Sequence, residues 1–281
     1  TKRYGMDFVV WGHDPWQRPI LQHLNWHPLW VSVFCAVMFV LAHAAYTVLS
    51  SGRKRTDHET NKLESQHGDV PERILRHSFM ARLFHWLMSV TMFVLLVTAF
   101  FPIIGLEFDW VPWHNWAGVI FTATIAWHIV HTTVWLDFWS IWAGPKDIPE
   151  FKALLLRETG QIATAPQPAK YPLGNQLYHW ILTIVGLTVI VTGVLMLFRI
   201  DNPFFEHNPY LISELAWGWV YVAHGLVGVS LVGLVVAHIY FALRPDHWWL
   251  TKAMVFGWIT RRQYLEHHEP NRWRVSSKKP W

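Results

Sequence analysis

The chain has 281 residues, of which 52% are hydrophobic and only 15% charged, and it carries 20 Trp, 18 His and a single Cys. Soluble domains contain about 25% charged residues, so the composition is strongly depleted in charge and excludes intrinsic disorder. One cysteine excludes a disulfide framework, a thiolate zinc site, an iron–sulfur cluster and a Cys-x-x-Cys-His haem attachment. The composition therefore indicates a membrane protein rich in imidazole.

Five apolar windows are long enough to cross a hydrocarbon layer about 30 Å thick, which takes roughly 20 helical residues. In chain order these windows cover 29–50, 83–101, 113–135, 177–198 and 217–243. Turn-forming residues bound each window, and tryptophans lie near the ends as in an aromatic belt. We predict an all-α integral membrane protein with five transmembrane helices. The weaker alternative is a set of core helices from a large soluble protein.

Lysines and arginines outside the windows are distributed unevenly. Of the 23 basic residues, 19 fall in 51–82, 136–176 and 244–281, which five spans place on one side of the membrane. The positive-inside rule makes that side cytoplasmic, with the N-terminus outside and the C-terminus in the cytoplasm. The net charge of +4 then reflects topology, and no nucleic acid partner is expected. An amphipathic helix over 250–265 is predicted along the cytoplasmic interface.

Histidines within the predicted spans fall at two depths. A lone buried histidine is more often structural than a ligand, so spacing has to decide between the two interpretations. His224 and His238 are 14 residues apart on one span, about 21 Å along the helix axis and on nearly the same face. His114 opens a span at the outer level, and His85 opens another at the inner level. The spacing predicts two pairs, His114 with His224 outside and His85 with His238 inside.

Two imidazoles that face each other supply what a bis-histidine haem iron needs, and helix bundles hold cofactors between facing helices. Gly118 and Gly228 would leave room for a flat macrocycle, although tight helix packing explains such glycines as well. Arg82 lies one turn before His85, where its guanidinium can pair with a haem propionate or anchor the helix at the cytoplasmic interface. The sequence favours two haems stacked across the bilayer.

Two other classes of protein could also carry histidines within membrane spans. A transporter or proton channel predicts polar residues along a path and broken helices, and a membrane anchor without cofactor leaves the two depths unexplained. We expect hydrogen bonds to neighbouring helices for most remaining span histidines, with ligation or a quinone or proton route as the alternatives. These residues are His43, His128, His131 and His179. His267 and His268, in the basic tail, are expected to be solvated.

Several motifs together are typical of a known family. They are Arg82-Leu-Phe-His85-Trp86, His114-Asn-Trp-Ala-Gly118 and the two histidines spaced by 14, His224 and His238. In these motifs, and over about residues 76–275, the chain resembles the cytochrome b (gamma) subunit of respiratory formate dehydrogenases, a family that includes hydrogenase-type cytochromes b. The resemblance implies a four-helix dihaem bundle. His85 and His238 would bind the inner haem b and His114 and His224 the outer one, with Arg82, Gly118 and Gly228 beside them.

The resemblance also implies a complex in the bacterial inner membrane. A molybdenum or tungsten pterin subunit outside would oxidise substrate, and an iron–sulfur subunit would pass electrons through this chain to menaquinone or ubiquinone near the inner haem. Quinone would contact Asn175, Gln176 and His179, with His238 behind them, although the first two can equally cap a helix. A hydrogenase, or a thiosulfate-type reductase fed by quinol, is the alternative within this class. A higher oligomer of the complex is compatible with the sequence.

The expected organisation follows from these assignments. Segment 1–28 is extracytoplasmic and lies on the membrane or docks a partner, and 29–50 is a transmembrane helix additional to the family's four. The remaining parts are a cytoplasmic loop over 51–82, the four-helix bundle over 83–243 and a cytoplasmic tail over 244–281. One hypothesis is that the first span replaces an anchoring helix of the iron–sulfur partner.

Overall fold

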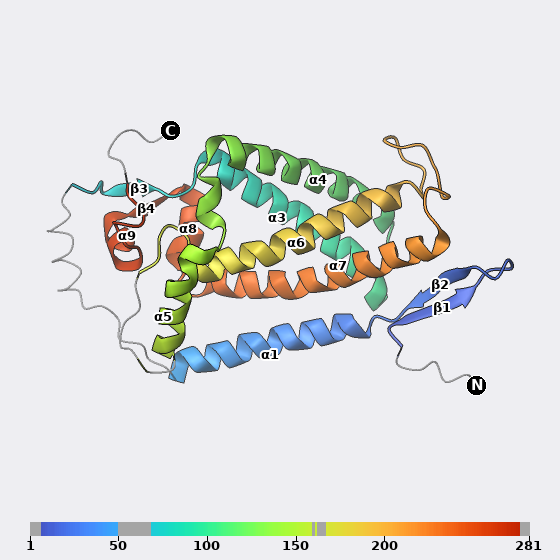
Figure 1. Ribbon diagram of the computed structural model, residues 1–281, viewed down its shortest axis with the longest axis horizontal. Coiled ribbons are helices and arrows are strands. Elements are labelled where there is room, and N and C mark those ends of the chain that lie inside the picture. Colours follow the sequence, from blue (N-terminus) through green and yellow to red (C-terminus); the bar gives the residue numbers. More distant parts are fainter. Residues whose placement is uncertain (1–6, 50–68, 159–160, 162–166, 276–281) are drawn as a thin grey trace. The chain divides into compact units, whose positions relative to one another are not determined.

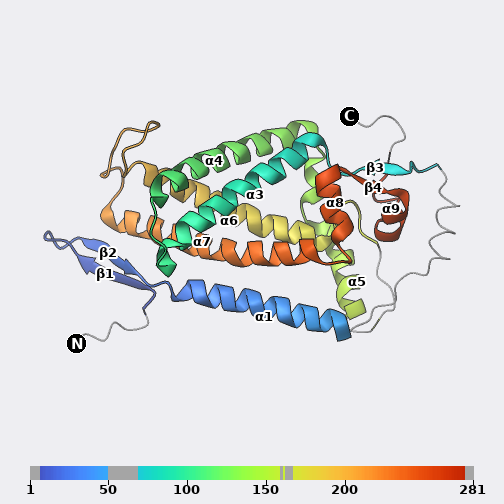
Figure 2. The same ribbon diagram turned by 180° about the vertical axis from the view of Figure 1, so that it is seen from behind.

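The computed structural model describes residues 7–49, 69–158, 161 and 167–275. Among these residues, five helices are long and apolar enough to cross a membrane. They are α1 (His27–Leu49), α3 (Phe79–Phe100), α4 (Trp110–Trp135), α6 (Leu173–Leu197) and α7 (Glu214–Leu243), which Figures 1 and 2 show from opposite sides. The predicted all-α membrane fold with five spans is confirmed. Parts of all five predicted segments lie outside the described part of the chain, at residues 1–6, 50–68, 159–160, 162–166 and 276–281.

All five helices begin two to four residues before the predicted windows. Ser78 precedes α3, and its Oγ accepts a hydrogen bond from the backbone N–H of Ala81 at 3.2 Å. Ser213 precedes α7 and accepts from the N–H of Ala216 at 3.3 Å. A serine in this position satisfies one of the N–H groups that a helix leaves free at its start. The caps therefore add a first turn that hydropathy alone does not predict.

The chain divides into two compact units. The first comprises Thr1–Tyr46, Ser89–Ala123 and Leu182–Ile239, and the second comprises Thr47–Met88, Thr124–Ile181 and Tyr240–Trp281. The boundaries fall inside helices, so α1, α3, α4, α6 and α7 each contribute residues to both units. Short 3-10 turns follow α3 and α4, at Pro102–Ile104, Phe138–Ile141 and Pro145–Asp147.

A β-hairpin precedes α1 in the first unit (Figure 1). Strands β1 (Val9–His13) and β2 (Pro19–Leu24) pair antiparallel. Asp14 stabilises the turn between them, because its carboxylate accepts hydrogen bonds from the backbone N–H of Arg18 at 2.8 Å and from its Nε at 2.7 Å. The sequence analysis predicted no strands in segment 1–28, so the hairpin is an element that it missed.

The N-terminal segment covers one face of α7 within the first unit. A Cβ added at Gly218 would lie 2.5 Å from the ring of Trp11, and one at Gly225 would lie 3.8 Å from the ring of Trp26. These glycines are seven residues apart and therefore share a helix face. Gly225, which stands next to His224 in sequence, thus makes room for the N-terminal segment.

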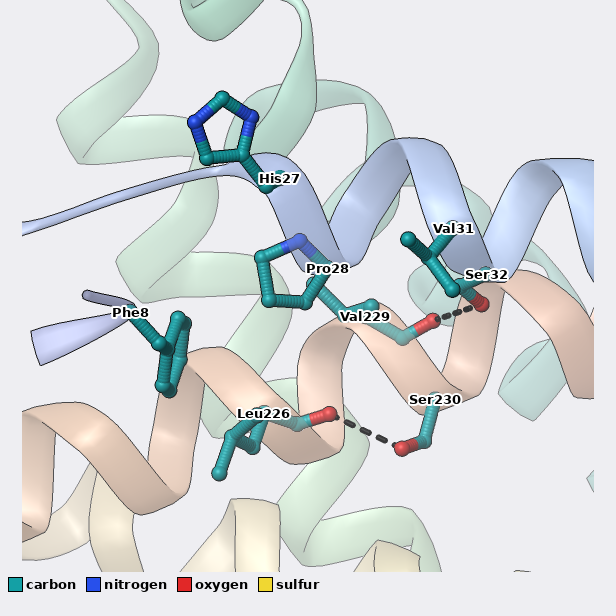
Figure 3. Close-up of a pocket in the computed structure, with 8 residues that line it drawn as sticks. All are labelled: Phe8, His27, Pro28, Val31, Ser32, Leu226, Val229 and Ser230. Carbon is teal, nitrogen blue, oxygen red and sulfur yellow. Dashed lines mark hydrogen bonds between the residues drawn. The ribbon is translucent and has the colours of Figure 1, made fainter. Parts of the chain in front are cut away.

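A groove of about 440 Å³ lies between the start of α1 and α7 in the first unit (Figure 3). Ser32 Oγ donates to the carbonyl of Val229 at 3.1 Å, and Ser230 Oγ donates to the carbonyl of Leu226 at 2.9 Å. Because both hydroxyls are bonded to helix carbonyls, the groove offers mainly apolar contacts. Its lining residues are Phe8, His27, Pro28, Val31, Ser32, Leu226, Val229 and Ser230. None of the predicted cofactor residues is among them.

The second unit contains a cap made from segments far apart in the sequence. Its elements are β3 (Arg73–Leu75), α5 (Ile148–Glu158), α8 (Trp248–Phe256), β4 (Trp258–Thr260) and α9 (Arg261–His267). Strands β3 and β4 pair antiparallel. The prediction of one amphipathic helix over 250–265 is wrong, because Gly257, with a φ of 91°, ends α8 and turns the chain into β4. This positive φ is common for glycine, which has no Cβ, and rare for other residues.

Arg76 joins the cap to the segment before α6. Only 2% exposed, it donates from Nη1 to Nε2 of His268 and from Nη2 to the carbonyl of Lys170, each at 2.9 Å. His268, 1% exposed, donates from Nδ1 to the carbonyl of Ala169 at 2.7 Å, so its Nε2 is the acceptor and the ring is neutral. Burial, and then Arg76, lowers the pKa of His268 to about 3. The expectation that His268 is solvated is wrong.

Candidate functional site

Two histidine side chains face each other in the first unit. His114 on α4 and His224 on α7 have ring centroids 6.4 Å apart and ring planes inclined by 72°. A bond from a transition metal to an imidazole nitrogen is about 2 Å long and the ring centre lies about 1 Å beyond, so two imidazoles on opposite sides of one metal have centres about 6 Å apart. The structure thus brings together the predicted outer pair at a separation that fits bis-histidine ligation.

Thr98 on α3 sets the hydrogen bonding of His114. Its hydroxyl donates to the carbonyl of Val94 at 2.7 Å and lies 2.8 Å from Nδ1 of His114. A hydroxyl has one hydrogen, so when that hydrogen is on the carbonyl the oxygen can only accept from Nδ1–H. This leaves the lone pair of His114 on Nε2, the form that a metal needs.

Thr192 on α6 stands in the same relationship to His224. Its hydroxyl donates to the carbonyl of Thr188 at 2.7 Å and lies 2.9 Å from Nδ1 of His224. The neighbouring Gly193 leaves space for the imidazole, because a Cβ there would lie 3.4 Å from its Cε1. Both histidines of the pair therefore have a threonine on an adjacent helix that orients the ring. Such outer hydrogen bonds are typical of histidines that bind metals.

The two glycines predicted beside the cofactors have ordinary neighbours. A Cβ at Gly118 would lie 3.9 Å from a methyl group of Leu95, and one at Gly228 would lie 3.7 Å from the ring of Phe100. These are van der Waals distances, so both positions tolerate close approach of a neighbouring side chain. Their role beside a haem stays a prediction.

His85 and His238, the predicted inner pair, fall in different units. His85 is half-buried on α3 in the second unit, and His238 is an exposed residue of α7 at the end of the first. Their pairing stays a prediction. Arg82, one turn before His85, donates from Nη1 to the carbonyl of Val255 at the end of α8 at 2.6 Å. That bond holds the guanidinium against the cap. The other N–H groups of Arg82 do not take part in it.

The start of α6 carries the side chains predicted to contact quinone. Asn175 is exposed, whereas Gln176 is only 4% exposed. The amide Nε2 of Gln176 donates to the carbonyls of Ser140 at 3.4 Å and Tyr171 at 3.3 Å. Its Oε1 is buried and has no hydrogen-bond partner among the described residues. A buried amide acceptor of this kind can receive a hydroxyl from a ligand.

His128 and His131, left open by the sequence, lie on α4 in the second unit. The ring of Phe84 contacts both, with centroids 5.7 and 5.2 Å away. Nδ1 of each is buried without a hydrogen-bond partner among the described residues. The expectation of hydrogen bonds to neighbouring helices is therefore not met at these two nitrogens. Within the described part of the chain, no group of three or more His, Cys, Asp or Glu side chains could hold a metal ion.

Comparison with known proteins assigns the family. A family model described as prokaryotic cytochrome b561 matches residues 76–257. The chain belongs to the prokaryotic cytochrome b561 family. It is also 26% identical, over 214 residues, to a Haemophilus influenzae protein named "Formate dehydrogenase, cytochrome b556 subunit", covering 70% of this chain and 81% of that protein. The resemblance found from the motifs is confirmed, and with it a haem-binding membrane cytochrome b.

The family match places α1 and the hairpin outside the shared region. The matched region begins at Arg76, just before α3, and ends at Gly257, the residue that terminates α8. Helices α3, α4, α6 and α7 of this cytochrome b all lie within it, as do the four histidines predicted to bind haem. The N-terminal segment that covers α7 is therefore an addition to the family's common part.

Sequence reasoning missed the two threonines of this cytochrome b that orient the histidine pair. Thr98 precedes His114 by 16 residues and Thr192 precedes His224 by 32, each on a different helix from its histidine. The available signal was weak: each is a hydroxyl residue in an apolar span, where such residues also bond to their own helix. Thr98 and Thr192 each donate their hydroxyl hydrogen to a carbonyl of their own helix. Their oxygens can therefore only accept a hydrogen bond from the imidazole.

Proposed function

We propose that this chain is the dihaem cytochrome b subunit of a formate dehydrogenase-type complex, and that it carries electrons from a periplasmic iron–sulfur subunit to quinone near the cytoplasmic side. The observation that carries the proposal is the facing pair of His114 and His224, whose rings are 6.4 Å apart and whose Nδ1 atoms are engaged by Thr98 and Thr192. The name of the Haemophilus influenzae relative suggests formate as the substrate of the complex.

The first haem b would be held by Nε2 of His114 and Nε2 of His224. The threonine hydroxyls orient both rings before any ligand arrives, so little ordering remains to be done on binding. Bound haem supplies a reversible one-electron carrier. Helices α4 and α7 contribute the ligands, α3 and α6 contribute the threonines, and each of the four common helices thus has one role in this site.

The second haem b would be held by His85 and His238. Support comes from the 14-residue interval between His224 and His238 on the continuous helix α7, which corresponds to about 21 Å along the axis. That rise would take the second ligand close to the opposite membrane surface, near which His85 lies, in the second turn of α3. Arg82 would pair with a haem propionate through the N–H groups that do not bind Val255. Gly118 and Gly228 would lie beside the macrocycles.

Orientation and partners follow from the charge distribution. With 19 of 23 Lys and Arg on one side, the C-terminus would be cytoplasmic and the N-terminus outside in the bacterial inner membrane. The start of α4, with His114, would then face the iron–sulfur subunit, and a molybdenum or tungsten pterin subunit beyond it would oxidise the substrate. The hairpin before α1 would add contact surface on that outer side.

Menaquinone or ubiquinone would accept the electrons near His238 and the start of α6. Reduction of a quinone to a quinol takes two electrons and two protons, so protons would be taken up from the cytoplasm. Asn175 and Gln176 offer amide groups for the quinone oxygens, and His179 lies one turn further along the helix. Uptake of protons inside and release by the substrate outside would generate a proton-motive force.

Haem content tests the proposal directly. A dithionite-reduced minus oxidised spectrum of the purified chain, with a pyridine haemochrome assay, should give two b-type haems per chain. His114→Ala and His238→Ala should each remove a different haem. A colourless protein from cells with full haem supply would contradict the electron-transfer role and leave a transporter or an anchor to explain the histidines.

A further inference from the structure

The segment after α4 packs against the first two turns of α6 in the second unit. The 3-10 turn Phe138–Ile141 leads into Trp142 and Ala143. The carbonyl of Ser140 accepts from Nε2 of Gln176 at 3.4 Å. The carbonyl of Ala143 accepts from the indole N–H of Trp180 at 3.3 Å. Two backbone carbonyls therefore fix this segment to one side of α6.

Trp142 lies between these two contacts. Its ring meets the ring of His179 edge-on, with centroids 4.7 Å apart, and that of Trp180 at 4.6 Å. Gln176, His179 and Trp180 are spaced by three and four residues, so they share one face of α6. Trp142 is therefore packed against the same face that presents the amide of Gln176, one helical turn away.

One buried polar atom on each of Trp142 and Gln176 has no hydrogen-bond partner among the described residues. One is the indole Nε1 of Trp142, a donor, and the other is Oε1 of Gln176, an acceptor. Gln176 is only 4% exposed. Native proteins rarely leave such groups unmet, and where they do the usual explanation is a ligand, an ion or a water. A ligand that accepts at one point and donates at another would satisfy both atoms.

The aromatic rings around these two atoms indicate which kind of ligand could bind there. Trp142, His179 and Trp180 present flat rings, which suit a flat, largely apolar partner with few polar atoms. A quinone headgroup has this shape. Its carbonyl oxygens accept hydrogen bonds, and reduction turns them into hydroxyl groups that can also donate.

We propose that Trp142 and Gln176 bind the quinone headgroup: the indole N–H of Trp142 donates to one ring oxygen, and Oε1 of Gln176 accepts from a hydroxyl of the reduced form. The inference rests on the proposed function, since it concerns the quinone that this function requires. It adds a donor from the segment after α4 to a site that the sequence placed on α6 alone. Because Oε1 can bond only to a protonated ring oxygen, Gln176 favours the quinol over the quinone.

The experiment uses the full chain with its haems in detergent, reduced and then mixed with short-chain menaquinone and ubiquinone analogues. In Trp142→Phe, haem content should equal that of the wild type, while the analogue concentration that half-saturates haem reoxidation should rise about tenfold, the loss expected for one buried hydrogen bond. In Gln176→Leu, haem content should also equal that of the wild type, while the quinol concentration that half-saturates reduction of the oxidised haems should rise about tenfold. Trp139→Phe, an indole of the same turn that is 71% exposed, is the matched control and should behave as the wild type.

A spectroscopic readout separates binding from rate. With a ¹³C-labelled quinone analogue, the infrared carbonyl band of the bound ligand should lie at lower frequency in the wild type and move up in Trp142→Phe. If the wild type reacts with quinone while Trp142→Phe keeps the wild-type half-saturation and carbonyl band, this inference is overturned and the proposed function stands. If the wild type binds haem but does not react with quinone, both are overturned. Should Trp142→Phe fail to fold, an unchanged quinol affinity in Gln176→Leu overturns the inference.

Discussion

The hydroxyl of Thr192 lies 2.9 Å from Nδ1 of His224 while its own hydrogen is directed to the carbonyl of Thr188. The same arrangement joins Thr98 and His114, so both facing imidazoles are held in one tautomer by residues from neighbouring helices. A ligand set ordered in advance loses little conformational freedom when its cofactor binds. The threonines therefore belong to the design of the site as much as the histidines do.

Replacing Thr192 by Val tests this relationship. Valine keeps the shape but cannot accept from Nδ1–H of His224, so we expect haem affinity at this site to fall about 10- to 100-fold. The haem midpoint potential should rise, because a less basic imidazole stabilises the oxidised iron less. Haem retention during dilution and a potentiometric titration measure the two effects. Thr188→Val is the control, since its hydroxyl donates to the carbonyl of Ile184 at 2.8 Å and bonds to no histidine among the described residues. An equal loss there would contradict the role of Thr192.

The space at Gly193 gives a second prediction. A Cβ at this position would already touch His224 at 3.4 Å, so the methyl groups of Gly193→Val would push the ring away from its place opposite His114. We expect loss of one of the two haems, counted by pyridine haemochrome. Gly186 lies on the same helix with nothing within 4 Å of its Cβ position, and Gly186→Val should keep both. Two haems in Gly193→Val would show that His224 does not need this space.

The facing of His114 and His224 could be predicted because the depth of a residue in a span follows from its position along the helix, whatever the details of packing; the pairing of His85 with His238 stays a prediction. His224 and His238 lie on α7 as expected, and His114 opens α4 opposite His224. The partners of these rings could not be predicted, because Thr98 and its histidine meet only when α3 and α4 pack together. Trp142 was missed for the same reason, since its indole meets α6 from a segment that hydropathy assigns to no element.

The spans were predictable to within a few residues because long apolar runs have one outcome in a bilayer. The hairpin was not, because β1 and β2 are only five and six residues long and pair with each other. In the tail, apolar spacing continues through Gly257, and only its φ of 91° divides the predicted helix. The burial of His268 depends on Arg76, 192 residues away in the chain, a contact with no local signal.

The cap should lose stability in mild acid. Burial and nearby positive charge lower the pKa values of His268 and His77 to about 3, from an ordinary value of 6.5. Between these values the unfolded chain binds more protons than the folded one, so the stabilisation is complete above pH 6.5 and is lost as the pH falls towards 3. For the fully buried His268 the slope is about 1.4 kcal/mol per pH unit.

Thermal unfolding of the cap, followed by tryptophan fluorescence at pH 7, 6 and 5, measures this dependence. His268→Gln removes one titrating group and should flatten the decline by about half. His13→Gln, in the hairpin of the first unit, should leave it unchanged. A pH dependence that is identical in the wild type and His268→Gln would mean that His268 is not held neutral by burial.

Arg76 should matter more to the stability of the cap than the other described arginines of the second unit. Its charge is surrounded by the rings of Tyr171, Trp249 and Trp273, with centroids 5.8, 5.5 and 5.5 Å away. Hydrogen bonds from a charged donor contribute about 1.5–3 kcal/mol each, and Arg76 makes two, to His268 and Lys170. Arg76→Met keeps apolar contact with the rings but loses both bonds. We therefore expect the tail to be released.

Limited proteolysis of the purified chain measures that release. Cleavage within 258–275 should become at least tenfold faster in Arg76→Met, while the haem held by His114 and His224 is retained. Arg76→Lys should behave like Arg76→Met, because an ammonium cannot reach both acceptors with the planar fork of a guanidinium. Arg262→Met is the matched control: that arginine makes an exposed ion pair with Glu266 on the same helix at 3.0 Å, and such pairs contribute only about 0.3–0.5 kcal/mol. Equal cleavage rates in Arg76→Met and Arg262→Met would mean that the aromatic rings, and not the two hydrogen bonds, hold the tail in place.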